Sequence, residues 1–179
     1  MLDGRPLADF GSLPLRLISY CQAAMTACVA AALLALFAQP AAAGMEDGVK
    51  AIQAGDLPAA EKALATLAKE RDPRAQFFLG LYVYGNPSSK LFDMDKAVPL
   101  LLDAAERGYT PAMIPLAGAY ADGKGVPKSF VEAYKWLSIA DAWNAPNAGQ
   151  LREQIAAQLK TEEIEQARSA ASTFTFKTK

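Results

Sequence analysis

The sequence predicts an all-α protein, built as an α/α solenoid of about four antiparallel helical hairpins. Three observations predict this fold. Apolar residues recur at helical spacing, capping residues and glycines mark helix ends, and a short pattern recurs along the chain. From residue 44 to residue 172, no segment alternates polar and apolar residues as a strand would.

Residues 1–43 have the pattern of a signal peptide. Two arginines precede an uncharged run at residues 21–38, Pro40 interrupts it, and three alanines at 41–43 supply a small-residue cleavage site. We expect cleavage before Gly44 and a periplasmic or secreted protein. The alternative is an uncleaved anchor in the inner membrane, because the uncharged run approaches the length of roughly 20 residues that spans a bilayer.

Composition narrows the classes of partner. The net charge is −1, and residues 1–43 contribute two basic and two acidic residues, so their removal leaves it unchanged. A nearly neutral chain is a poor nucleic-acid binder, because neutralisation of phosphates dominates that affinity. Cys21 and Cys28 both lie in the predicted signal peptide, so we expect no disulfide in the mature protein.

Eight helices are predicted, beginning near residues 46, 57, 73, 94, 111, 130, 147 and 162. A capping oxygen stands before a proline at three of these starts: Asp56 before Pro58, Asp72 before Pro73 and Thr110 before Pro111. Acidic residues occupy two further first turns, with Asp93 and Asp95 in one and Glu162 and Glu163 in the other. Gly55 and Gly108 stand where helices should end.

Apolar spacing supports the second, sixth and seventh helices. The residues are Ala60, Leu64, Leu67 and Ala68 in the second, Phe130, Ala133, Tyr134, Leu137 and Ala140 in the sixth, and Leu151, Ile155 and Leu159 in the seventh. Residues 173–179 alternate polar and aromatic side chains. We expect a frayed tail there, the alternative being a strand added to a partner's sheet.

A repeated pattern indicates that the hairpins are related. Ala75-x3-Leu79-Gly80 recurs 37 residues later as Ala112-x3-Leu116-Ala117. Small residues at 80 and 117 would let helix backbones approach closely. A unit of this size cannot cover its own apolar face, so neighbouring units must stack.

One unit resembles the Sel-one-like repeat, a relative of the tetratricopeptide repeat. Its residues are Ala112-x3-Leu116-x3-Tyr120-x2-Gly123-x-Gly125-Val126-Pro127, followed by Glu132-Ala133-Tyr134-Lys135-Trp136-Leu137. Residues 73–108 resemble the repeat less closely, and residues 46–70 and 147–172 look like terminal hairpins of such proteins. The resemblance implies an adaptor or regulatory scaffold that acts through protein contacts, often outside the cytoplasmic membrane of bacteria. It also implies that Tyr120, Tyr134 and Trp136 pack between helices.

No catalytic, cofactor or metal site is predicted, so we expect a protein that is not an enzyme. The chain has no histidine, and no cysteine follows residue 43, which excludes the usual nucleophile pairs and zinc ligand sets. Gly118-x4-Gly123-Lys124 approaches a phosphate-binding loop. However, Gly125 replaces the required Ser or Thr, and no strand precedes the pattern. The paired carboxylates are better explained as helix caps than as metal ligands.

The candidate binding site is a groove on the first helices of the hairpins, because these helices line the concave surface of tetratricopeptide-like stacks. Counting along the second and third hairpins predicts an apolar groove with charged margins, suited to a peptide or helix. Its residues are Arg74, Phe77, Leu81, Tyr84, Ile114, Ala121 and Asp122, and the same count places Gly118 on this face. The alternative is that Phe77 and Leu81 are buried against the first hairpin.

We therefore expect an exported scaffold that binds an unidentified protein or peptide in the bacterial envelope, as an adaptor or regulator. The alternative is a cell-wall-associated protein, ligand-binding or enzyme-like, that recognises peptidoglycan fragments. A groove lined by carboxylates and amides would favour that alternative. Nucleic acid is not an expected partner, and membrane contact is expected only through an uncleaved N-terminal segment.

Overall fold

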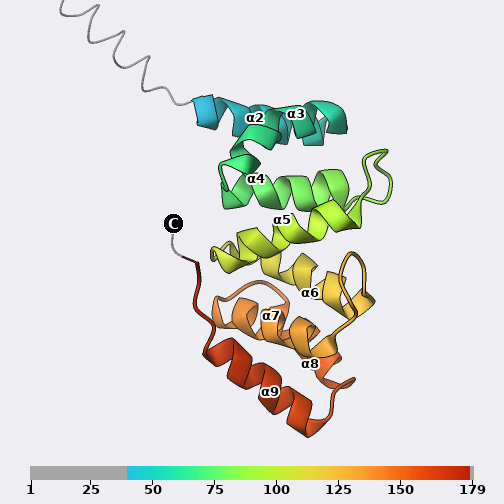
Figure 1. Ribbon diagram of the computed structural model, residues 1–179, viewed down its shortest axis with the longest axis vertical. Helices are drawn as coiled ribbons and strands as arrows, with labels where there is room; N and C mark the ends of the chain where they lie inside the picture. The colour runs from blue at the N-terminus through green and yellow to red at the C-terminus, as the bar shows by residue number, and fades with distance from the viewer. Residues whose placement is uncertain (1–39, 178–179) are drawn as a thin grey trace, which may run out of the picture. The chain divides into compact units, whose positions relative to one another are not determined.

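The computed structural model describes residues 40–177, which fold as a stack of helices (Figure 1). Nearly all of the predicted signal peptide, including Cys21 and Cys28, lies outside the described residues. The elements are α2 (Pro40–Gln53), α3 (Leu57–Lys69), α4 (Pro73–Phe78), η1 (Leu79–Tyr84), α5 (Met94–Glu106), η2 (Thr110–Ala112), α6 (Met113–Asp122), α7 (Phe130–Ala142), α8 (Ala148–Ala156) and α9 (Thr161–Ser172). The described part of the chain is thus all-α with eight α-helices, which confirms the predicted fold class.

Side-chain caps mark the starts of α3, α4, α5 and α7. The carboxylate of Asp56 accepts from the backbone N–H of Ala59 at 3.1 Å, and that of Asp72 accepts from Arg74 at 2.9 Å. Asp93 caps α5 in the same way, which confirms its predicted role. The predicted cap at Thr110 is wrong, because Thr110 is itself the first residue of the 3₁₀ turn η2, which has no side-chain cap.

The helix that begins at Pro73 changes its winding halfway. It runs as an α-helix to Phe78 and continues as the π-helix η1, Leu79–Tyr84. A π turn closes with i→i+5 hydrogen bonds and so holds more residues than an α turn. Residues beyond Leu79 therefore face other directions than a 3.6-residue count predicts.

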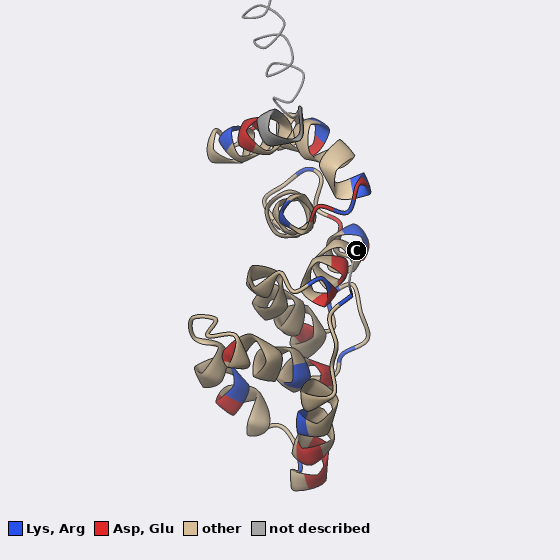
Figure 2. Cartoon of the chain, turned by 90° about the vertical axis from the view of Figure 1, so that its left-hand side faces the viewer, with Lys and Arg blue, Asp and Glu red and all other residues tan. Residues whose placement is uncertain are grey.

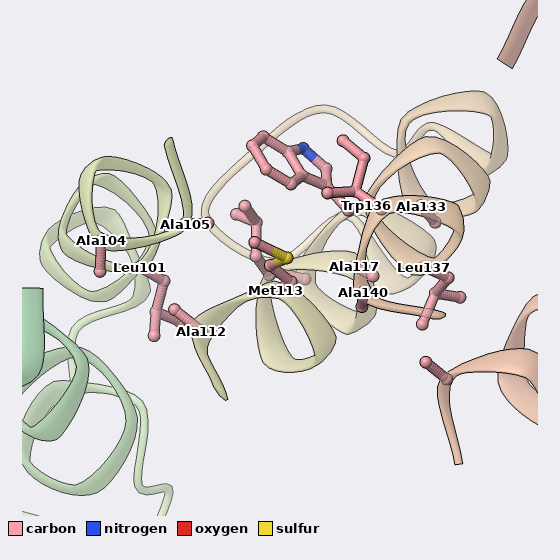
Figure 3. Close-up of a cluster of buried hydrophobic side chains, with 14 of the residues drawn as sticks. Leu101, Ala104, Ala105, Ala112, Met113, Ala117, Ala133, Trp136, Leu137 and Ala140 are labelled. Atoms are coloured by element: carbon pink, nitrogen blue, oxygen red, sulfur yellow. The ribbon is translucent and has the colours of Figure 1, made fainter. Parts of the chain in front are cut away.

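Each helix pair packs on the next to form a solenoid. α3 contacts α4 and η1, these contact α5, α5 contacts α6, and α6 contacts α7. The largest core cluster lies between α5, α6 and α7, where many of the buried side chains are alanines around Met113 and Trp136 (Figure 3). Small residues allow the close approach that the sequence predicted: a Cβ at Gly80 would lie 3.0 Å from the carbonyl oxygen of Ala97.

The C-terminal tail is docked, so the prediction of a frayed end is wrong for residues 173–177. The ring centroids of Phe174 and Trp136 lie 5.2 Å apart, and those of Phe176 and Trp143 lie 5.4 Å apart. The backbone N–H of Lys177 donates to the carbonyl of Glu106 at 2.7 Å. Aromatic pairs of this geometry add stability beyond the area they bury, which accounts for the ordered tail.

None of the helices in the described part of the chain has the length and apolarity needed to cross a bilayer.

Candidate functional site

Two adjoining depressions form an apolar groove along η1, α6 and α8. The first has a volume of about 270 Å³ and contains Leu81 of η1 and Asp122 of α6. The second, also about 270 Å³, contains Ile114 and Ala121 of α6. Gly118 lines both depressions, so the two meet at this residue. Four of the seven predicted site residues are thus brought together here.

Most of the other side chains that line the groove are apolar. The first depression is completed by Pro87 and Phe92 of the loop that precedes α5, by Met94 and Leu101 of α5 and by Pro115 of α6. The second is completed by Leu137 of α7 and by Leu151 and Ile155 of α8. Figure 2 shows long stretches of the helices without Lys, Arg, Asp or Glu. An apolar depression on a solvent-exposed surface is typical of an interaction site.

Charged groups stand at one edge of the groove. Lys124 donates to the carboxylate of Asp122 at 2.7 Å, and both side chains are more than half exposed. This hydrogen bond lowers the pKa of Asp122 from its ordinary value. An exposed pair contributes little to stability, but it gives this edge a defined arrangement of charge that can orient a partner.

Three predicted site residues lie elsewhere. Phe77 is only 8% exposed, but it belongs to the main core cluster with residues of α5, α6 and α7 and not to the cluster formed with α3, so it is buried in a different place from the predicted alternative, the first hairpin. Tyr84 donates its hydroxyl to Glu61 of α3 at 2.5 Å; burial, reinforced by that hydrogen bond, raises the pKa of Tyr84 to about 12. Arg74 pairs with Asp72 at 2.8 Å, at the start of α4.

The π-helix explains why the count failed at Tyr84. With η1 wound as a π-helix, Tyr82 is the exposed tyrosine, at 41%, while Tyr84 turns toward α3. Tyr82 stacks on Phe78 with ring centroids 5.8 Å apart. Phe92 was also missed, although it lines the first depression and is 46% exposed. The sequence signal for Phe92 was an aromatic residue in a loop, which periodicity cannot evaluate.

The helix-packing residues behave as the resemblance implied. Tyr134 and Trp136 are each 1% exposed, and Tyr120 is partly buried. Among the described residues no group of three or more His, Cys, Asp or Glu side chains is placed to hold a metal ion.

A solved structure with the same fold identifies the architecture. The chain is similar to the crystal structure of c5321, described as a protective antigen present in uropathogenic Escherichia coli strains and displaying an SLR (Sel-one-like repeat) fold. The TM-score is 0.69 at 24% sequence identity, and the match covers 75% of this chain and 29% of c5321. The chain therefore has the Sel-one-like repeat fold, although it spans less than a third of the neighbour's length. No protein-family model and no curated protein matches the chain.

Proposed function

We propose that this protein is a non-enzymatic scaffold that binds an apolar segment of another protein in the groove along η1, α6 and α8. The observation that carries the proposal is the pair of apolar depressions meeting at Gly118. Stacked helical repeats present extended binding surfaces of this kind. The groove also has a charged edge at Asp122 and Lys124, which can fix the orientation of the bound segment.

The division of the groove into two depressions suits side chains of a bound segment. Each depression holds about 270 Å³, and the two meet at Gly118. Two such depressions side by side suit a peptide or helix that inserts one apolar anchor into each. The partner we expect is therefore an amphipathic segment whose apolar face carries two anchoring side chains.

The lining does not favour the alternative of peptidoglycan recognition. A sugar-peptide fragment carries hydroxyl and amide groups that need hydrogen-bonding partners across the whole site. Charged and amide side chains in the groove are limited to Asp122, Lys124 and Gln154. Peptidoglycan binding would leave many of the fragment's polar groups facing apolar surface, which costs free energy.

The place of action is part of the proposal and rests on the sequence. The signal-peptide pattern of residues 1–43 supports export, and an exported scaffold would meet its partner in the bacterial envelope as an adaptor or regulator. An uncleaved segment would instead hold the groove at the inner membrane.

Gly118 provides a sharp test because a Cβ built there meets no atom within 4 Å. Gly118→Trp should fill both depressions without disturbing the core. Gly118→Ala is the matched control, since it leaves the groove open and improves helix propensity by up to about 1 kcal/mol. A photo-cross-linking residue at Asp122 would capture the partner in intact cells. We expect the cross-linked species to be kept in Gly118→Ala and lost in Gly118→Trp.

Two results would contradict the proposal. One is capture of the same species by both variants, which would place the contact outside the groove. The other is a purified cross-linked partner whose affinity for the isolated protein is the same for both Gly118 variants.

A further inference from the structure

A second cavity lies between α8 and α9, separate from the groove. Its volume is about 350 Å³, and none of its lining residues lines the groove. Both α8 and α9 pack against α7, which contributes Tyr134 and Ser138 to the cavity, and Trp143 directly after α7 also lines it. The docked tail adds the rings of Phe174 and Phe176. The cavity therefore combines α7 with the last helix pair and the docked tail.

The polar part of this cavity presents mainly hydrogen-bond donors. Arg152 of α8 and Arg168 of α9 both line it, and the Nε of Arg168 donates to the hydroxyl of Tyr134 at 3.1 Å. The hydroxyls of Ser138 and Ser172 donate to backbone carbonyls of their own helices. Two guanidinium groups and a phenol in one small cavity favour an anionic guest.

The carboxylates near these arginines are placed toward solvent. Arg168 pairs with Glu165 at 2.9 Å, and Arg152 pairs with Glu153 at 2.9 Å. The side chains of Glu165 and Glu153 are 64% and 68% exposed, so water screens their charge. Arg168 donates from Nε to Tyr134 and from Nη1 to Glu165, and its Nη2 has no acceptor among the described residues. The buried Nε of Arg152 also has no acceptor among these residues. These pairs therefore hold the guanidinium groups in position and leave donor capacity on both arginines.

Asp141 is the least exposed of the three carboxylates that pair with these arginines. Its side chain is 39% exposed and accepts from Arg152 at 2.6 Å. Arg152 is thus engaged by two carboxylates, whereas Arg168 is engaged by one. We assign the main contact with an anion to Arg168 for this reason.

The apolar part of the cavity is largely aromatic. Trp143 and Phe176 lie edge to face with centroids 5.4 Å apart, and Phe174 and Phe176 lie 5.3 Å apart. Ile139 and Ala171 complete this side. Trp143 is 58% exposed, which is unusual for so large an apolar side chain and leaves its ring available to a guest.

We propose that this cavity binds a carboxylate attached to an apolar group, with the carboxylate at Arg168 and Tyr134 and the apolar group against Trp143 and Phe176. Two sources present this chemistry: a small organic acid, and the C-terminal residue of a peptide. In either case the guest combines one charge with one apolar group, as the two parts of the cavity do. The site is independent of the groove.

Three probes test the proposal on the purified protein by calorimetry and by tryptophan fluorescence, to which Trp143 in the cavity and the buried Trp136 both contribute. They are acetyl-Gly-Leu-Phe with a free carboxylate, the same tripeptide as its C-terminal amide, and 3-phenylpropionate. We expect the free carboxylate to bind at least about tenfold more tightly than the amide, because a hydrogen bond to a charged group is lost in the amide. Binding of 3-phenylpropionate as tight as that of the tripeptide would indicate a small acid, and much weaker binding would indicate a peptide C-terminus.

Variants link binding to the assigned residues. Arg168→Gln should weaken binding of the free tripeptide at least about tenfold, and Arg168→Lys should retain part of it. Glu165→Gln is the matched control and should not weaken binding, since it removes a competitor for Arg168. Gly118→Trp should leave binding unchanged, which separates this site from the groove.

The proposal is overturned if the free carboxylate and the amide bind equally, or if none of the three probes shows saturable binding. It is also overturned if Arg168→Gln binds the tripeptide as the unsubstituted protein does. Thermal unfolding of each variant establishes that the fold is intact. An intact fold is the expected result for Arg168→Gln, because the Arg168 side chain is 58% exposed.

Discussion

The side-chain amide of Gln76 donates to the carboxylate of Asp103 at 2.7 Å and joins α4 to α5. The same carboxylate accepts from Arg71, at the end of α3, at 2.7 Å, and from Arg107, one turn further along α5, at 3.3 Å. Gln76 is 4% exposed, and the side chain of Asp103 is 16% exposed. One partly buried acidic group thus links the first helix pair to the second and helps to fix their relative position.

Asp103→Asn should destabilise the fold by about 2 kcal/mol, because it removes hydrogen bonds to a charged acceptor and leaves Arg107 poorly paired. Arg107 is only 12% exposed, so water cannot replace the lost partner fully. Urea denaturation would measure the change in the free energy of unfolding. Asp47→Asn is a suitable control, because Asp47 is exposed and its substitution should change stability by no more than about 0.5 kcal/mol.

The contribution of Asp103 should also depend on pH. Burial by itself raises the pKa of Asp103, but hydrogen bonds from Arg71, Gln76 and Arg107 outweigh it, and the pKa is lowered. A carboxyl whose pKa is lower in the folded state contributes stability that is complete above its unfolded pKa and is lost as the pH falls through its folded pKa. The stability difference between the unsubstituted protein and Asp103→Asn should therefore be constant from pH 8 to about 5 and should shrink below about pH 4. A difference that grows in acid would contradict this assignment.

Phe77→Asp should abolish cooperative folding, because Phe77 is 8% exposed and packs at 5.3 Å on Tyr109. Burying an unpaired carboxylate there costs several kcal/mol in addition to the lost packing. Circular dichroism during heating would show loss of the unfolding transition. Tyr82→Ser is the informative comparison, since the exposed Tyr82 should be replaceable with little change in melting temperature. A folded Phe77→Asp variant would place Phe77 on the surface after all.

Local signals in the sequence predicted the helices well. The starts at Leu57, Pro73, Met94 and Phe130 follow from a capping side chain one residue earlier, which acts within the first turn and needs no distant partner. The π-helix η1 has no such local signal. In the wider π turn, Tyr82 lies at the surface and Tyr84 faces α3. Counting 3.6 residues per turn therefore placed Leu81 correctly in the groove and placed Tyr84 there wrongly.

The remaining errors concern contacts between residues far apart in the sequence. Gln76 and Asp103 are 27 positions apart, and Lys177 reaches Glu106 across 71 positions. Periodicity reports only which side of a helix is apolar, and it cannot report which polar group on a neighbouring helix completes a hydrogen bond. For the same reason, the polar and aromatic alternation of residues 173–177 was compatible with a free tail, a strand or a docked segment.

The docked tail should contribute measurably to stability through Phe174. Phe174→Ala removes a partly buried ring that packs on Trp136, and we expect a loss of about 2 kcal/mol, less than for a fully buried phenylalanine. Thr175→Ala is the control, because Thr175 is exposed and should be neutral. Urea denaturation followed by tryptophan emission, to which Trp136 and Trp143 both contribute, would report the stability of each variant. A neutral Phe174→Ala would mean that the tail is not held by this contact.

Gly125, in the loop between α6 and α7, should tolerate no side chain. Its φ is +68°, and a Cβ there would lie 2.4 Å from the carbonyl oxygen of Met94, so Gly125→Ala adds a backbone clash to the strain of a left-handed conformation. Gly55 isolates the strain, because its φ is +76° but a Cβ there meets nothing within 4 Å. We expect Gly55→Ala to cost about 1 kcal/mol and Gly125→Ala at least about twice that, measured by urea denaturation. Equal costs for the two variants would mean that α5 and this loop move apart easily, and that the contact between the second and third helix pairs is loose at Met94.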